Sequence, residues 1–248
     1  MNTPLRLFTL AALATSTACS SMSSEDVDTD GMYAQIGVEA RGNGQTEVRV
    51  SLRAGDADSM TWIELDGGDR LYAEREDLRV RLSEYDSTFE QFEYGTALDG
   101  EFVGTPVRVE LRRERFADAD NSVVSLPAPF DLKVGNAGQT FETGVDAVAL
   151  RWGQGSADTI AVEVEGDCIL DYRTSAMPDT GAFELPPQAL EAYSGEGEGS
   201  TCSAVVRVRR TRVGALDPQF EGGRITASQV REVRIRVVVR GDRSTDAQ

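Results

Sequence analysis

The sequence predicts an all-β protein built as two tandem antiparallel β-sandwiches. Three observations favour this fold class. Apolar and charged residues alternate with a period of two from residue 32 onward, as in sheets that have one covered and one solvated face. Clusters of Gly, Asn and Asp separate the alternating runs, and no long amphipathic helical pattern interrupts them. The 248 residues include 40% hydrophobic side chains, which is enough to build a core.

The alternating runs are the predicted strands. In the run 47–53, Val48, Val50 and Leu52 alternate with charged or polar residues. Four further runs repeat this pattern: 78–82, 107–112, 204–209 and 233–239. We expect the apolar residues of each run to face a core and the arginines between them to face solvent.

Two prolines mark the predicted boundary between the sandwiches. Pro127 and Pro129 cannot both lie in a central strand, because proline has no N–H to donate to a ladder. The sequence therefore predicts a first sandwich over 32–126 and a second over 127–240, followed by a polar tail over 241–248. Both sandwiches have a normal size for a β domain.

The second half has a recognisable order of strands. The runs 130–134, 147–152 and 159–165 would be its first three strands, and Trp152 ends the second of them. This order resembles fibronectin type III modules, within the wider immunoglobulin-like class of sandwiches. It differs from the antibody pattern, in which the tryptophan lies between two cysteines.

The N-terminus carries a predicted export signal over residues 1–18. A basic start, a short apolar run and small residues precede Cys19. Ser16-Thr17-Ala18-Cys19 resembles the lipobox of bacterial lipoproteins and departs from it at Ser16, where the family has an aliphatic residue. The resemblance implies cleavage before Cys19, which becomes the new N-terminus, and lipidation of this cysteine, palmitate included. Ordinary signal peptidase cleavage after Ala18 is the alternative.

The segment 19–31 is expected to be a flexible, lipidated tether, because it has almost no apolar content. Residue 20 is serine where a retained inner-membrane lipoprotein would have aspartate. By resemblance to enterobacterial sorting, this predicts a lipid-anchored protein of the cell envelope at the outer membrane, facing the periplasm or the surface.

Stretches through most of the chain are similar to acidic lipoproteins of bacteria. They are 65–73, 126–130, 178–183, 217–220 and 223–229. These motifs have a structural character, and the resemblance implies no activity.

Three cysteines divide into one anchor and one pair. With Cys19 assigned to lipid, Cys168 and Cys202 remain, and an exported chain meets an oxidising compartment. The simplest prediction is a Cys168–Cys202 disulfide. An unpaired buried thiol and an intermolecular bridge are the alternatives.

Composition excludes several function classes. The chain has no histidine, so it has no Ser-His-Asp or Cys-His catalytic set and no histidine metal ligand. The formal net charge of −17 argues against a nucleic-acid partner, whose phosphates need cations. The sequence contains no phosphate-binding glycine loop and no nucleophile elbow. We therefore expect neither catalysis nor a cofactor.

Two acidic loops are weak calcium candidates. Asp56 and Asp58 lie in one loop, and Asp118 and Asp120 lie in the other. Aspartates at alternate positions can offer oxygen ligands to Ca²⁺, but neither loop continues with the Gly and Glu of an EF-hand. We therefore expect both loops to be solvated acidic turns, with calcium binding as the weaker alternative.

The preferred functional hypothesis is a lipid-anchored envelope protein that acts as a binding or structural module. Its partners would be the membrane, through the lipid, and an envelope protein or glycan. The alternative is an exported carboxylate-based hydrolase or a calcium-dependent carbohydrate-binding module. That alternative predicts a concave cluster of Asp and Glu side chains.

Overall fold

The computed structural model describes residues 20–85, 92–101, 103–135 and 138–240. Within these ranges the chain is β-strands and loops, with three short 3-10 helices and no α-helix. The expected all-β fold of two sandwiches is confirmed. The predicted signal 1–18, Cys19 and the predicted tail 241–248 lie outside the described residues.

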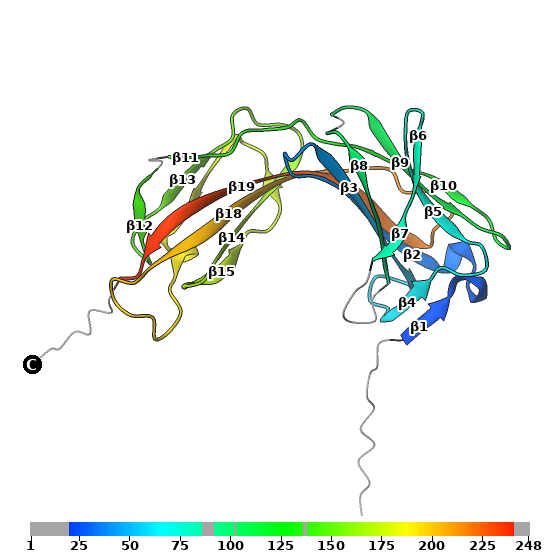
Figure 1. Cartoon of the computed structure of the whole chain (residues 1–248), viewed down its shortest axis with the longest axis horizontal. Coiled ribbons are helices and arrows are strands. Elements are labelled where there is room, and N and C mark those ends of the chain that lie inside the picture. Colours follow the sequence, from blue (N-terminus) through cyan, green and yellow to red (C-terminus); the bar gives the residue numbers. More distant parts are fainter. Residues whose placement is uncertain (1–19, 86–91, 102, 136–137, 241–248) are drawn as a thin grey trace, which may run out of the picture.

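The two sandwiches stand side by side as the legs of an arch (Figure 1). The first contains β2 (Met32–Ala40), β3 (Gln45–Ala54), β4 (Thr61–Glu64), β5 (Arg70–Arg75), β6 (Leu78–Arg81), β7 (Ser83–Tyr85), β8 (Glu93–Asp99), β9 (Pro106–Arg112) and β10 (Ala119–Ser125). The second contains β11 (Lys133–Val134), β12 (Thr140–Glu142), β13 (Val148–Arg151), β14 (Thr159–Gly166), β15 (Ile169–Arg173), β16 (Met177–Pro178) and β17 (Ala182–Leu185), followed by the 3-10 helix η3 (Pro187–Leu190).

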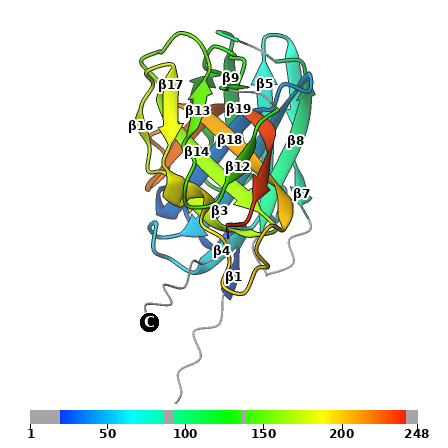
Figure 2. The same ribbon diagram turned by 90° about the vertical axis from the view of Figure 1, so that its left-hand side faces the viewer.

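Two long strands, β18 (Thr201–Val213) and β19 (Gly222–Val238), belong to both sandwiches. They form an antiparallel ladder from Thr201 opposite Val238 to Val213 opposite Thr226. β14 pairs with β18 in the second sandwich, while β2 pairs with the first half of β19, in parallel, in the first sandwich. One sheet of twelve strands therefore runs through both legs of the arch. In the turned view of Figure 2, β14, β18 and β19 of this sheet lie across the centre of the picture.

A smaller sheet covers each end of this common sheet. The four-stranded sheet β10-β9-β5-β6 closes the first core, and the three-stranded sheet β11-β13-β17 closes the second. The predicted alternation holds in β3, where Val50 is buried and Arg49 is exposed, and in β9, where Val109 is buried and Arg108 is exposed; Glu110 of β9 is the exception, because it is buried and paired with Arg79. It fails at Leu78, which is 39% exposed because β6 is an edge strand with little sheet above it.

The chain returns to the first core late in the sequence. Phe220, Ile225 and Ala227 pack with the core of the first sandwich, whereas Phe130 and the residues of β13, β14 and β17 build the second. The expected continuous second sandwich over 127–240 is therefore wrong, because the first half of β19 completes the first sheet. The two sandwiches are also not purely antiparallel, since β19 runs parallel to β2 and β12.

Residues 20–31 are folded, which corrects the expected flexible tether. β1 (Ser20–Ser23) pairs in parallel with β4, and the 3-10 helices η1 (Ser24–Asp26) and η2 (Thr29–Gly31) follow it. Low apolar content predicted disorder here, but hydrogen bonds from the first sandwich hold the segment instead.

The guanidinium of Arg113 is the centre of this attachment. Its side chain is fully buried, and its Nε pairs with Asp69 at 2.7 Å. Its terminal nitrogens donate to the carbonyls of Ser24 (2.6 Å) and Val27 (3.0 Å). They also reach the hydroxyl of Thr29 and the sulfur of Met32. All five donors of the guanidinium are thereby satisfied, three of them by the N-terminal segment.

We expect Arg113→Lys to release residues 24–29 from the first sandwich. An ammonium has three donors and no planar fork, so it cannot replace the bonds to Asp69 and to both carbonyls. Amide hydrogen exchange should show lost protection in 24–29, while β18 and β19 stay protected. Arg115→Lys is the control, because Arg115 is exposed and its guanidinium lies 5.8 Å from the centre of the Phe116 ring. Equal exchange in both variants would contradict the attachment.

Candidate functional site

The junction between the two sandwiches, which we call the waist, is built around Phe130. Arg210 of β18 and Arg231 of β19 approach its ring, at 4.8 Å and 5.7 Å from the ring centre. Arg231 donates to Glu101 in the first sandwich at 3.2 Å. Arg210 donates to the carbonyl of Ala128, in the predicted linker, at 2.9 Å. The waist therefore ties together the linker, the common sheet and both sandwiches.

Asp179 is the buried counterion of the waist. Its side chain is fully buried, and one oxygen lies 2.8 Å from Nε of Arg210, whose side chain is 3% exposed. The two atoms form an ion pair that is not aligned as a hydrogen bond. Trp152 Nε1 donates to the other oxygen at 2.7 Å, and the Ser156 hydroxyl donates to the paired oxygen at 2.8 Å.

Burial and hydrogen bonding act in opposite directions on Asp179. Burial raises the pKa of its carboxyl. The hydrogen bonds from Trp152, Ser156 and the Gly181 N–H, together with the charge of Arg210, lower the pKa by more than burial raises it, so the net pKa lies below its ordinary value. The carboxylate therefore stays charged. This is the environment of a structural ion pair and does not provide a proton donor.

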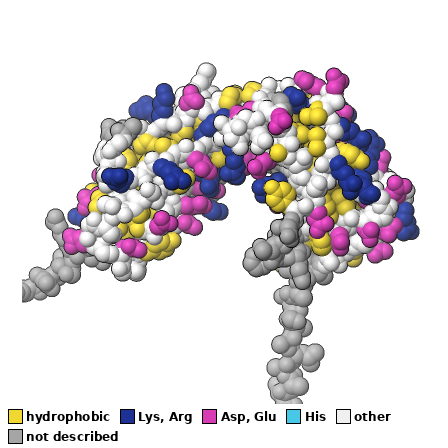
Figure 3. Space-filling view, viewed as in Figure 1, with side chains coloured by type: hydrophobic (Ala, Val, Ile, Leu, Met, Phe, Trp, Pro, Cys, Tyr) yellow, Lys and Arg dark blue, Asp and Glu magenta, His cyan; other side chains and the backbone are white. Residues whose placement is uncertain are grey.

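A ladder of ion pairs crosses the inner face of the arch. It runs from β15 to β2 through Arg173–Glu165 (3.1 Å), Glu165–Arg207 (3.6 Å), Arg207–Glu232 (2.7 Å), Glu232–Arg41 (3.7 Å), Arg41–Glu39 (2.6 Å) and Glu39–Arg209. The bond to Glu232 raises the pKa of Arg207. Figure 3 shows Lys/Arg and Asp/Glu side chains mixed on the underside of the arch. The predicted solvent-facing arginines are thus largely neutralised by acids on neighbouring strands.

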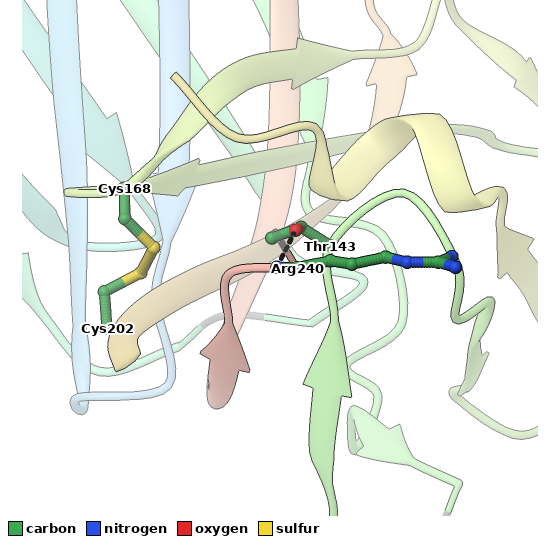
Figure 4. The surroundings of a disulfide bond; sticks show 4 residues. All are labelled: Thr143, Cys168, Cys202 and Arg240. Carbon is green, nitrogen blue, oxygen red and sulfur yellow. Dashed lines mark hydrogen bonds between the residues drawn. A yellow bond between two sulfur atoms is a disulfide. The ribbon is translucent and has the colours of Figure 1, made fainter. Parts of the chain in front are cut away.

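The predicted disulfide is confirmed. Cys168, in the turn after β14, is bonded to Cys202 near the start of β18, with a Cα–Cα distance of 6.1 Å. Figure 4 shows the bond beside the end of β19, where the Arg240 N–H donates to the Thr143 hydroxyl at 2.9 Å. The bond thus holds one end of the second sandwich. The unpaired thiol and the intermolecular bridge are excluded.

The calcium candidates do not form a cation site. One terminal nitrogen of Arg112 lies 2.9 Å from a carboxylate oxygen of Asp118 and 3.3 Å from one of Asp120. The Arg112 guanidinium therefore already occupies the position in which a cation would bind. Asp56 and Asp58 are exposed, and an oxygen of Asp56 accepts from the N–H of Asp58 in its own turn. Among the described residues, no three acidic or cysteine side chains gather closely enough to hold a metal ion.

A cavity of about 640 Å³ opens at the side of the second sandwich. Its walls combine apolar side chains, Leu132, Val134, Phe141 and Ile235 among them, with the cations Lys133, Arg234 and Arg236. Apolar walls and a few charged groups are typical of a binding site. We therefore take this cavity as the candidate functional site.

Sequence reasoning predicted the disulfide and missed this cavity, the Arg210–Asp179 pair and the Arg113 attachment. The cavity lies where β11, β12 and β19 meet, which no local pattern indicates. A signal for the waist exists in the sequence. Arg210 and Gln229 lie directly opposite each other and occupy inward positions where the apolar alternation of both strands breaks.

Comparison with known proteins yields structures alone. No family model matches the chain, and no curated protein matches it. A cytokine receptor complex is 10% identical, covering 85% of this chain and 100% of that one, with a TM-score of 0.30. The chicken CNTN1 FN1–FN3 domains are 11% identical over 90% of this chain and 69% of theirs, with a TM-score of 0.27.

The Yersinia pseudotuberculosis adhesin InvE is 12% identical over 85% of this chain and 59% of its own, with a TM-score of 0.24. TM-scores this low carry no argument about function, and the fold class rests on the strands and cores described above. No helix in the described ranges has the length and apolar character needed to cross a bilayer.

We expect Arg210→Met to destabilise the protein by about 3 kcal/mol, because it leaves the Asp179 carboxylate buried without its counterion. The measurement is urea unfolding followed by tryptophan fluorescence. Arg173→Met is the matched control, since Arg173 is 62% exposed in its pair with Glu165 and should cost less than about 1 kcal/mol. Equal losses of unfolding free energy in the two variants would show that the Arg210–Asp179 pair stabilises the protein no more than an exposed ion pair does.

The Asp179 carboxylate should also make stability depend on pH. Because its pKa is lower in the folded state, its contribution is complete above the unfolded value of about 3.9 and is lost as pH falls through the folded pKa. The difference in unfolding free energy between wild type and Asp179→Asn should therefore stay constant from about pH 7 to pH 5 and shrink below about pH 4. Asp131→Asn, at an exposed position, is the control. A difference that does not shrink would refute the ion pair.

Proposed function

We propose that this chain is a lipid-anchored protein of the cell envelope that acts as a rigid binding or structural module without catalysis. The single observation that supports it most is the β18–β19 ladder. It fixes two sandwiches as one arch, so surfaces on both legs are held at a constant spacing. A fixed spacing suits a protein that binds or braces a larger partner.

The state of the carboxylates supports a role without catalysis. A carboxylate hydrolase needs a pair of acids free to donate and accept protons. Of the five buried acids in the described structure, Asp69, Asp158, Asp179 and Glu110 are each paired with an arginine, and Asp217 accepts hydrogen bonds from the N–H groups of Asn121 and Gln219. The acids on the inner face are paired in the same way, so the concave cluster of free acids that the alternative requires is not formed there.

The folded N-terminal segment changes what a lipid on Cys19 would do. β1 begins at Ser20, directly after that cysteine, and it lies at the foot of the first sandwich (Figure 1). An anchor at Cys19 would therefore attach to a folded edge with no flexible tether between them. The foot of this leg would rest near the bilayer, and the inner face of the arch would lie close to the membrane surface.

The acidic surface favours attachment through the lipid alone. A formal charge of −17 repels anionic lipid headgroups, so contact with the bilayer would depend on the acyl chains. The serine at position 20 supports sorting to the outer membrane, with the arch facing the periplasm or the surface.

Anchoring is tested by Cys19→Ser in a Gram-negative host. The variant should move from the membrane fraction to the soluble fraction, because a serine hydroxyl cannot accept the thioether-linked lipid. Ser16→Leu is the control, since it brings the lipobox closer to the family pattern and should leave the protein in membranes. Membrane retention of Cys19→Ser in carbonate-washed envelopes would disprove the anchor.

The binding role is tested separately by crosslinking in intact envelopes followed by affinity purification. We expect one partner, protein or glycan, to be recovered reproducibly with the wild-type chain. If replicates share no partner, the binding role fails whatever the outcome for Cys19.

A further inference from the structure

One edge of β19 is open in the middle of the common sheet. β2 pairs with this edge as far as Gln229, which lies opposite Ala40, and β12 pairs with it from Arg236, which lies opposite Thr140. Between these two partners, no strand of the described chain pairs with the edge. At the rise of a β-strand, residues 230–235 leave about 20 Å of unpaired edge.

The backbone groups on this open edge can be assigned by alternation. The Val238 carbonyl accepts from the Thr143 N–H at 3.0 Å, on the side where β12 pairs. The register with β18 is continuous from 226 to 238, so the even-numbered residues of β19 turn their peptide groups to this side. The Val230 carbonyl is taken by its neighbour Arg231, at 2.8 Å. Glu232 and Arg234 therefore present backbone donors and acceptors that no described strand pairs with.

The apolar cavity lies along this edge. Val233 and Ile235 point into it from β19, and Leu132, Val134 and Phe141 close it from β11 and β12. β11 is itself the edge strand of the small sheet, so the second sandwich is open between the edges of its two sheets at this point. An added strand would cover the side of the core as well as complete the ladder.

The rim of the cavity is positively charged in a protein that is otherwise acidic. Lys133, Arg234 and Arg236 are exposed, and none has an acid within 4.0 Å among the residues that the structure describes. Arg151, also exposed, lies opposite Lys133 in the small sheet. Figure 3 shows Lys/Arg and hydrophobic side chains next to one another over this leg of the arch. On the rest of the common sheet, within the described residues, most arginines are paired with Asp or Glu side chains, and Arg53 and Arg224 are the exceptions.

We propose that the open edge of β19 binds an extended segment of a partner protein in which apolar and acidic residues alternate. Its backbone would pair with Glu232 and Arg234, and its apolar side chains would enter the cavity. Its acidic side chains would then lie on the other face, beside Arg234 and Arg236. This proposal rests on the binding role given above and is independent of the lipid anchor.

The first test uses a fluorescent synthetic peptide of about eight residues that alternates Glu and Val. Anisotropy with the purified full chain should show saturable binding, at least about tenfold tighter than for the matched peptide of Lys and Val. A lysine peptide that binds equally well would overturn the charge complementarity, and with it the proposal.

The second test separates strand addition from simple filling of the cavity. In an extended peptide, the N–H groups of the Glu residues and of the Val residues point to opposite edges. Methylation of the backbone nitrogens in one set should abolish binding, whereas methylation in the other set should preserve it. Equal affinity of the two methylated peptides would show that no ladder forms and would overturn the proposal.

The third test changes the protein. Arg234→Gln with Arg236→Gln should weaken binding of the Glu-Val peptide at least about tenfold. Arg224→Gln is the matched control, because Arg224 is an exposed cation on β19 at the end that β2 covers. Sedimentation should show the same monomer for all variants. Self-association that depends on Arg234 and Arg236 would identify a second copy as the occupant and overturn the proposal.

A further comparison keeps this proposal distinguishable from the proposed function. If crosslinking recovers a partner equally well with the wild type and with the Arg234/Arg236 variant, the binding role stands and this site is wrong. If the peptide binds but no partner is recovered, the site stands and the envelope role fails.

Discussion

The β18–β19 ladder is the constraint on which the rest of the structure depends. The two strands are continuous through both sandwiches, and β19 alone is 17 residues long. Movement of one leg against the other would have to break this ladder at the waist, where Arg210 and Gln229 lie opposite each other and are buried. Ruptured backbone hydrogen bonds in a buried place are costly. The arch is thus a consequence of strand continuity, and the linker 127–129 contributes mainly by giving Arg210 a carbonyl to bind.

The waist also explains why one sheet supports two cores. Inward positions of β18 are Ala204, Val206 and Val208 in the second core and then Arg210, whose guanidinium binds Asp179. On β19 the inward positions change from Ile225 and Ala227 of the first core to Gln229, and then to Ile235 and Val237 of the second. A polar break in two paired apolar stripes therefore separates the cores. Continuous apolar stripes would have favoured one elongated core, with no buried carboxylate for Arg210 to pair with.

Local sequence patterns predicted the strands correctly, but they did not predict features that depend on residues far away in the chain. Alternation in 47–53 and 107–112 predicted strands because each apolar residue there faces a core. The pairing of β19 with β2 joins residues far apart in the chain, such as Gly222 and Tyr33, so the proline pair at 127 and 129 misled the division into domains. Residues 20–31 have only two apolar side chains, Met22 and Val27, and counting apolar residues cannot detect that Arg113 supplies the donors for the carbonyls of this segment. The disulfide was predictable because the predicted export and the assignment of Cys19 to lipid left two cysteines to pair.

Arginine rather than lysine makes these arrangements possible, and it also defines the open edge. The planar fork of Arg113 binds carbonyls of the N-terminal segment together with Asp69, and Arg207 bridges Glu163 and Glu232 across three strands. Because most arginines on the common sheet are already paired, their charge is not available to a ligand. The unpaired cations beside the gap in β19 are therefore a local feature within a repulsive acidic field. A partner segment with acidic but no apolar residues would be repelled by the net negative charge of the protein and would gain no burial in the cavity. An apolar strand without acids would leave Arg234 and Arg236 unmatched, so the edge selects for both properties in one extended segment.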